Sequence, residues 1–381
     1  MMQNKRESAI ELLKIGAILM IIISHVVQTL GSTELYIGSY PIDAFIDFSK
    51  STTSIKIMFF QNLRYLGHLG NAVFFICSAW FLCDSKTVSL KKIVLMILDV
   101  WIISLIFVVI AKYIAIDVSI IIIIKSIFPT IFSNNWYVTF YILIYAMHPI
   151  LNIVIEQLNR KALLSICLVS SILYFGMCFL KADLFFATNL ITYIVLYFCI
   201  AYIKKYANKY KKNIRLNVKI LLFACGANSG LIYLTNIFGL IGEQYVKDLG
   251  LQVLRWNSIC NPFLIIIALC LFNIFRNIHF VDKTVNYVSS LSLLIYVIHE
   301  NIIFRRYIRP LIFVEIFTRY GYDLIIIWVA LIVLILFISS VILAILYQKT
   351  MHKITLMIAN KICPKLILAF DEITEVLIKI D

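Results

Sequence analysis

Runs of about 20 predominantly apolar residues recur along the whole chain, and they restrict the possible folds more than any other feature. An α-helix needs about 20 residues to cross the ~30 Å hydrocarbon core of a bilayer, whereas strands and buried helices of soluble domains are usually shorter. The composition agrees, because 62% of the 381 residues are hydrophobic, only 14% are charged, and the mean hydropathy is +0.96. Soluble domains carry roughly a quarter charged residues. The sequence therefore predicts an all-α integral membrane protein, with the lipid bilayer as its first partner.

The pattern predicts about ten transmembrane helices in one domain over residues 1–349, followed by a tail over 350–381. The tail alternates apolar and charged residues, which is typical of an amphipathic helix on the cytoplasmic membrane surface. The predicted spans cover residues 8–30, 62–83, 91–112, 136–156, 162–180, 184–203, 217–238, 256–275, 286–304 and 323–347.

Basic residues between the spans predict the orientation. The loop 204–219 holds seven Lys and Arg and no acid, and it falls on the same side as both termini of a ten-span chain. By the positive-inside rule that side is the cytoplasm, so we expect a multi-pass protein of the plasma membrane with cytoplasmic termini. The net charge of +14 then reflects topology, and we expect no nucleic-acid partner. The segment "RRYIRP" (305–310) is an exception, because it falls on the predicted outer side.

The first predicted span, "ELLKIGAILMIIISHVVQ" (11–28), carries ionisable residues that a purely structural span would not use. Eleven helical steps separate Lys14 from His25, which leaves an angular offset of about 20° and a separation of about 16 Å. Ionisable groups inside a span normally face a cavity or a partner. Lys14 can alternatively extend to the inner surface or pair with Glu11, and His25 can be a histidine hydrogen-bonded between helices.

The ninth predicted span repeats this pattern in "SSLSLLIYVIHENII", where His299, Glu300 and Asn301 follow an apolar run. Two histidines at a similar depth, one beside a carboxylate, suit acid–base catalysis, although polarity at a helix end is the alternative. His148 lies nearer the predicted cytoplasmic end of its span, and we interpret it as structural. His68 is either a loop or a helix-start residue. The cysteines form no CxxC pair and have no zinc-like spacing with histidine, so we expect no metal.

Four segments in order resemble the acyltransferase 3 family of integral-membrane O-acyltransferases. "IELLKIGAILMIIISHVV" is similar to the family's N-terminal signature, a basic residue and a histidine separated by ten residues, with Lys14 where the family usually has Arg. "GHLGNAVFFICSAWFL" (67–82) resembles its second-span pattern, with Ala79 in place of a glycine. "NNWYVTFYILIYAMHPILN" (134–152) and "SSLSLLIYVIHEN" (289–301) resemble its Trp-Tyr segment and its late span ending in Tyr-x-x-His.

This resemblance implies transfer of an acyl group, most often acetyl from cytoplasmic acetyl-CoA, to a hydroxyl of a glycan at the outer face. The phosphates of acyl-CoA need cations on the cytoplasmic side, where we expect Lys14, Lys91 and Lys92 to bind them. His25 would act as a general base or as a nucleophile that carries the acyl group. Glu300 or His299 would orient His25 or move its proton.

A multi-pass glycan exporter or secondary transporter is the alternative function, since buried polar groups within about ten helices also suit transport. Transporters often contain internal repeats and helices broken by Gly or Pro. Only Pro149 and Pro262 interrupt the predicted spans, and no repeat is visible. The sequence therefore favours the enzyme, but it leaves the acceptor open among surface polymers and small metabolites.

Overall fold

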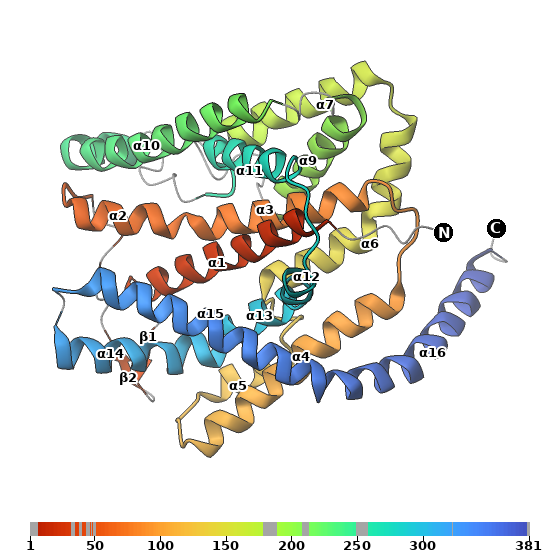
Figure 1. Cartoon of the computed structure of the whole chain (residues 1–381). Coiled ribbons are helices and arrows are strands. Elements are labelled where there is room, and N and C mark those ends of the chain that lie inside the picture. The colour runs from red at the N-terminus through yellow and green to blue at the C-terminus, as the bar shows by residue number, and fades with distance from the viewer. Residues whose placement is uncertain are drawn as a thin grey trace.

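The computed structural model of the chain is helical except for one short antiparallel hairpin (Figure 1). It describes residues 7–31, 35–37, 40–42, 46, 48, 51–177, 189–207, 213–248, 258–321 and 323–378. The hairpin pairs β1 (Leu35–Ile37) with β2 (Tyr40–Ile42).

The helices are α1 (Ser8–Leu30), α2 (Ile55–Arg64), α3 (Leu66–Leu82), α4 (Leu90–Tyr113), α5 (Ile120–Ile127), α6 (Trp136–Gln157), α7 (Arg160–Ile172), α9 (Asn189–Tyr202), α10 (Ile214–Asp248), α11 (Pro262–Phe275), α12 (Lys283–Ser290), α13 (Ser292–His299), α14 (Arg309–Tyr320), α15 (Ile325–Lys349) and α16 (His352–Ile378). Short π-helical segments occupy Leu173–Met177, Ile203–Ala207 and Phe304–Ile308. Several helices begin where a side chain caps the free backbone N–H groups: Asn159 caps α7, Asn261 caps α11 and Asp282 caps α12.

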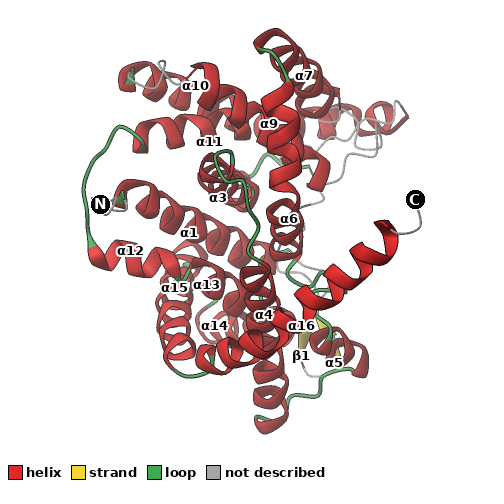
Figure 2. Cartoon of the chain, turned by 90° about the vertical axis from the view of Figure 1, so that its right-hand side faces the viewer, coloured by secondary structure: helices red, strands yellow, loops and turns green. Residues whose placement is uncertain are grey.

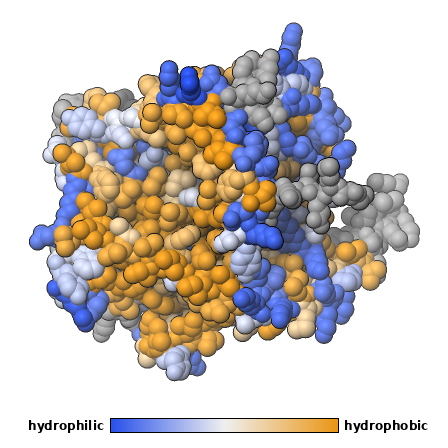
Figure 3. Space-filling view, viewed as in Figure 1, coloured by the Kyte–Doolittle hydropathy of each residue, from blue (hydrophilic) through white to orange (hydrophobic). Residues whose placement is uncertain are grey.

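Eight helical segments among the described residues are long and apolar enough to cross a membrane, which confirms a helical membrane protein. Figure 3 shows a broad apolar band over the face seen in Figure 1, with hydrophilic residues gathered at its left and right edges. The long helices of Figure 1 run across this band from edge to edge. This is the surface that a bilayer would cover. The count of ten spans and the cytoplasmic termini stay predictions.

The boundaries of several predicted spans differ from those of the observed helices. The second begins earlier, at Ile55, because α2 continues into α3 with only Tyr65 between them. The eighth is the short helix α11, which begins at Pro262. The fifth predicted span, 162–180, is helical as far as Met177, and its last residues lie outside the described part of the chain, as do the first residues of the sixth and eighth spans.

The prediction that 286–304 is one continuous span is wrong. The chain forms α12, breaks at Leu291, forms α13, and breaks again after His299. At the second break the Asn301 side chain accepts a hydrogen bond from the backbone N–H of Ile303, which starts the next helical segment. Broken helices are tolerated at membrane depth where protein surrounds the freed backbone groups, and His299, Glu300 and Asn301 are all buried.

Helix α1 lies at the centre of the molecule and contacts α2, α3, α11, α12, α13 and α15 (Figure 1). It runs parallel to α12 and α13, since Ser8 bonds to Asp282, Glu11 bonds to Ser289 and His25 contacts His299. Both views show α12 beside α1 (Figures 1 and 2). This parallel pairing brings the two predicted histidines to the same level.

The tail predicted over 350–381 forms α16, whose first half packs against α4. Asp99 of α4 is buried and bonds to two residues at the α15–α16 junction. Its Oδ1 accepts hydrogen bonds from the Tyr347 hydroxyl at 2.8 Å and lies 3.1 Å from Nδ1 of His352. Figure 2 shows the rest of α16 projecting away from the bundle.

Candidate active site

The site is centred on His25, which projects from α1 and contacts residues at the C-terminal end of α13. Its Nδ1 lies 2.8 Å from Oε2 of Glu300 and 3.2 Å from Nε2 of His299. All three residues are buried, with exposed fractions of 8%, 4% and 1% for His25, Glu300 and His299. The structure therefore brings together all three residues that the sequence predicted to be catalytic.

The charge of Glu300 is balanced by two arginines that follow it in the chain. Its Oε1 accepts a hydrogen bond from Arg305 at 2.8 Å, and its Oε2 lies 3.5 Å from Arg309, whose side chain is only 3% exposed. Burial lowers the pKa of Arg309 below its ordinary value, and the Glu300 carboxylate opposes that shift. A buried carboxylate is stable only when cations or hydrogen-bond donors surround it, and Glu300 has both.

Hydrogen bonds assign the protons of the two histidines. Nδ1 of His299 lies 2.7 Å from the backbone oxygen of Ile295, which can only accept, so this nitrogen carries the proton. Neutral His299 then presents Nε2 as an acceptor toward His25. Nδ1 of His25 must be its protonated nitrogen, since it faces the Glu300 carboxylate and this acceptor. Within the described part of the chain no group hydrogen-bonds to Nε2 of His25, so its lone pair is available for chemistry.

The same three side chains are a conceivable metal site, because their ligand atoms lie within 4.8 Å of one another. The Nδ1–H group of His299 donates a hydrogen bond to the backbone oxygen of Ile295, an arrangement that metal-binding histidines commonly show. The positive charges of Arg305 and Arg309 beside Glu300 would repel a metal dication, however, and direct hydrogen bonds already join the three ligand atoms. The arrangement suits a proton-transfer site better than a metal centre.

Two tyrosine rings pack near the histidine pair. The Tyr296 ring lies 6.4 Å from the His25 ring and 5.7 Å from the His299 ring. Tyr137 of α6 is the second, with its ring 5.9 Å from that of Tyr296. Rings that exclude water strengthen the electrostatic interactions of the groups that they enclose.

Toward the N-terminal end of α1 lies Lys14, one of the three residues predicted to bind the donor. Nζ of Lys14 lies 3.4 Å from Oε1 of Glu11, while Lys92 lies 4.4 Å from the centre of the Tyr145 ring and repels Lys14 electrostatically. Lys91 and Lys92 are both exposed at the start of α4. Lys14 is paired with Glu11, which is the alternative that the sequence left open for this residue.

His148 takes no part in the His25 cluster. Its Nδ1 bonds to the backbone oxygen of Tyr145 in its own helix at 2.6 Å. His68, in contrast, is the third residue of α3 and lies close enough to His25 to interact with it electrostatically.

Sequence reasoning missed Arg305 and Arg309 as members of the site. The signal was present, because "RRYIRP" is basic on the predicted outer side, against the positive-inside rule. The structure supplies the reason for the exception: two of its three arginines neutralise Glu300.

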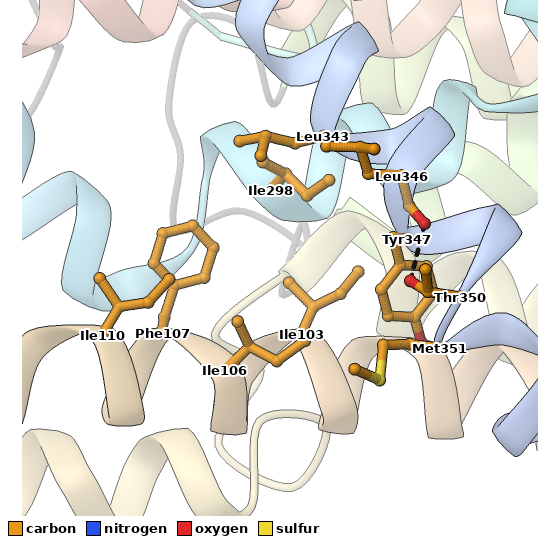
Figure 4. Close-up of a pocket in the computed structure, with 10 residues that line it drawn as sticks. All are labelled: Ile103, Ile106, Phe107, Ile110, Ile298, Leu343, Leu346, Tyr347, Thr350 and Met351. Carbon is orange, nitrogen blue, oxygen red and sulfur yellow. Dashed lines mark hydrogen bonds between the residues drawn. The ribbon is translucent and has the colours of Figure 1, made fainter. Parts of the chain in front are cut away.

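An apolar pocket of about 220 Å³ lies beside α13, between α4 and α15 (Figure 4). Its wall includes Ile298, the residue before His299. Its lining residues are Ile103, Ile106, Phe107, Ile110, Ile298, Leu343, Leu346, Tyr347, Thr350 and Met351. This lining suits a hydrocarbon group and not a phosphate, so the pocket is no site for the charged part of a CoA donor.

A model of a protein family, described as an acyltransferase domain of the acyltransferase 3 type, matches residues 7–346. The matched range includes the complete His25 cluster and both arginines that bind Glu300. No curated protein and no solved structure matches the chain.

Proposed function

The chain belongs to the acyltransferase 3 family, and from that premise we propose that it transfers an acyl group, most often acetyl, from cytoplasmic acyl-CoA to a hydroxyl of a cell-surface glycan. The observation that carries this proposal is the buried contact of His25 with Glu300, with Nε2 of His25 left unbonded among the described residues. A histidine so held is a general base directed at a substrate hydroxyl.

In the proposed reaction, Nε2 of His25 takes the proton from the acceptor hydroxyl as its oxygen attacks the thioester carbonyl. A new C–O bond forms, the C–S bond breaks, and the CoA thiolate leaves. The proton then passes from His25 to that thiolate, so the histidine returns to its neutral form. Glu300 stabilises the transient imidazolium through the 2.8 Å contact at Nδ1.

His299 and the two arginines act through other groups. His299 presents an acceptor nitrogen 3.2 Å from Nδ1 of His25 and thereby favors the tautomer that leaves Nε2 free. Arg305 and Arg309 hold Glu300 in place and ionised. The alternative, in which Nε2 of His25 carries the acyl group itself, uses the same nitrogen and differs in forming an acyl-histidine intermediate.

We propose that the donor binds at the inner end of α1, where Lys14, Lys91 and Lys92 supply positive charge. Lys14 lies about 16 Å along the helix from His25, a distance that the long pantetheine arm of CoA suits. In this arrangement Lys14 would share its charge between Glu11 and a donor phosphate.

One observation favours the second candidate, a transporter or exporter. Helix α13 ends at His299 and the next helical segment starts after Asn301, so the helix is discontinuous at the buried polar site, as helices of secondary transporters often are. Family membership favours the enzyme. The acyl content of the surface glycans distinguishes the two functions, because only the enzyme adds acyl groups.

The test is mass spectrometry of surface glycans from a null strain that carries the wild-type protein, His25→Ala or His148→Ser, normalised to protein in the membrane. We expect wild type to restore acyl adducts, His25→Ala to lower them roughly 10²–10⁴-fold, and His148→Ser to keep most of them. Normal acylation by His25→Ala would exclude the proposed mechanism. Equal acylation with and without the gene, combined with a lower amount of surface glycan, would favour the exporter.

A further inference from the structure

Helix α3 packs closely against α1 at the residue before His25. A Cβ atom at Gly67 would lie 2.6 Å from Oγ of Ser24, the residue before His25, so only glycine allows this approach. The Ser24 hydroxyl also donates a hydrogen bond to the backbone oxygen of Arg64. This contact fixes the start of α3, and with it His68, against the His25 segment of α1.

Two polar atoms in the first half of α3 are buried and have no hydrogen-bond partner among the described residues: Nδ1 of His68 and Oδ1 of Asn71. The two residues are three positions apart, which places their side chains about 60° apart on one face of the helix. His68 interacts electrostatically with His25. Asn71 is 4% exposed, and its backbone oxygen lies 3.5 Å from the hydroxyl of Tyr137.

Buried polar atoms without a partner are uncommon, because burial removes their hydrogen bonds to water. If a buried asparagine contributed only packing, replacing it by leucine, which has a similar volume, would not lower the stability of the protein. Unsatisfied groups beside a catalytic base are instead what a hydroxyl-rich substrate would satisfy on binding.

We propose that His68 and Asn71 form an acceptor subsite, in which Nδ1 and Oδ1 bind hydroxyl groups that neighbour the hydroxyl attacked at His25. The proposal rests on the acyltransferase function proposed above and assigns to these two residues the binding of an acceptor with several closely spaced hydroxyls, such as a sugar ring. Both residues position the substrate, and neither exchanges a proton in the reaction.

The test compares Asn71→Leu and His68→Leu with wild type in the null strain, again as acyl groups per glycan and per folded molecule. We expect each variant to lose about tenfold or more of its acyl transfer, the effect of one or two lost substrate hydrogen bonds. The midpoint of thermal unfolding in detergent should stay equal or rise for Asn71→Leu, because an unpaired buried polar group is removed. Stabilisation of the purified protein by acetyl-CoA should remain as in wild type, because the donor binds elsewhere.

Asn236→Leu is the matched control. Asn236 is a buried asparagine whose amide bonds to Oε1 of Gln61 at 2.8 Å and to the backbone oxygen of Ile232 at 2.9 Å. Its loss should lower the unfolding midpoint and leave acyl transfer per folded molecule unchanged.

Unchanged transfer by both α3 variants would overturn the proposal and would mean that bound water alone satisfies these atoms. Loss of transfer together with a lower unfolding midpoint, or with loss of the acetyl-CoA effect, would also overturn it in favour of a structural role. If wild type itself restores no acylation, the proposed function fails and the subsite with it. Equal acylation by wild type and by both α3 variants refutes the subsite only.

Discussion

Replacing Glu300 by glutamine separates the electrostatic role of this residue from its shape. In the structure its carboxylate lies 2.8 Å from His25, 2.8 Å from Arg305 and 3.5 Å from Arg309. Glutamine keeps the size and one acceptor oxygen but removes the charge. Glu300→Gln should therefore lower both the stability of the protein and its acyl transfer, for two distinct reasons.

The loss of stability comes from Arg309, whose side chain is 3% exposed and would remain as a buried cation without a counter-ion. Breaking a buried pair in this way costs roughly 3–5 kcal/mol, and the remaining amide oxygen favours the lower end of that range. Arg305 is one-third exposed and contributes little, because solvent screens its charge. The double variant Glu300→Gln/Arg309→Met should recover most of the lost stability, since it leaves no unpaired charge.

The loss of activity comes from His25. A hydrogen bond to an ionised acceptor is roughly twice as strong as a neutral one, and the imidazolium loses its counter-ion as well. We expect transfer to fall about 10–100-fold, which corresponds to about 1.4–2.7 kcal/mol, and the double variant to remain as slow. Recovery of activity in the double variant would contradict the role given to Glu300.

The measurements are the thermal unfolding midpoint in detergent and acyl groups per surface glycan, both normalised to folded protein. Glu315→Gln is the control, because it makes the same substitution in an exposed i,i+4 pair with Arg319. Exposed pairs contribute little, so this variant should resemble wild type. An unchanged midpoint for Glu300→Gln would refute the buried-charge reasoning.

Three further predictions concern the donor, the topology and metal. In steady-state kinetics, Lys14→Ala should raise the apparent KM for acyl-CoA at a normal protein level, and Lys14→Arg should behave as wild type. If Lys14→Ala lowers activity only by lowering the amount of folded protein, then Lys14 serves only as the ion-pair partner of Glu11. Reporter tags at either terminus and within 204–215 should report the cytoplasm and a tag in the 31–61 loop the outside, and an external 204–215 would overturn the predicted orientation. Prolonged dialysis against a chelator should leave acyl transfer unchanged, because a hydrogen-bonded His–Glu pair needs no ion; loss of activity restored by zinc would identify the cluster as a metal site.

The sequence by itself determined the class of fold and the chemical character of α1. A membrane helix satisfies its own backbone hydrogen bonds, so apolar length alone predicts it, and most of the predicted spans are helices here. Helix geometry alone also predicts that Lys14 and His25 lie on the same side of α1, about 16 Å apart. The sequence failed at 286–304, because an apolar run does not reveal where a helix breaks when surrounding protein buries the freed backbone.

Only the tertiary structure decided what His25 contacts. His25 and His299 are 274 positions apart, and periodicity shows that each is polar within an apolar helix but not that the two helices run parallel in register. The same holds for Glu300, whose carboxylate contacts two arginines that the charge pattern shows only as an exception on the predicted outer side. The periodicity of a helix follows from the geometry of neighbouring residues and can be read from the sequence. The counter-ions of a buried charge depend on which distant segments pack around it, and a buried charge needs such counter-ions because it has lost its water.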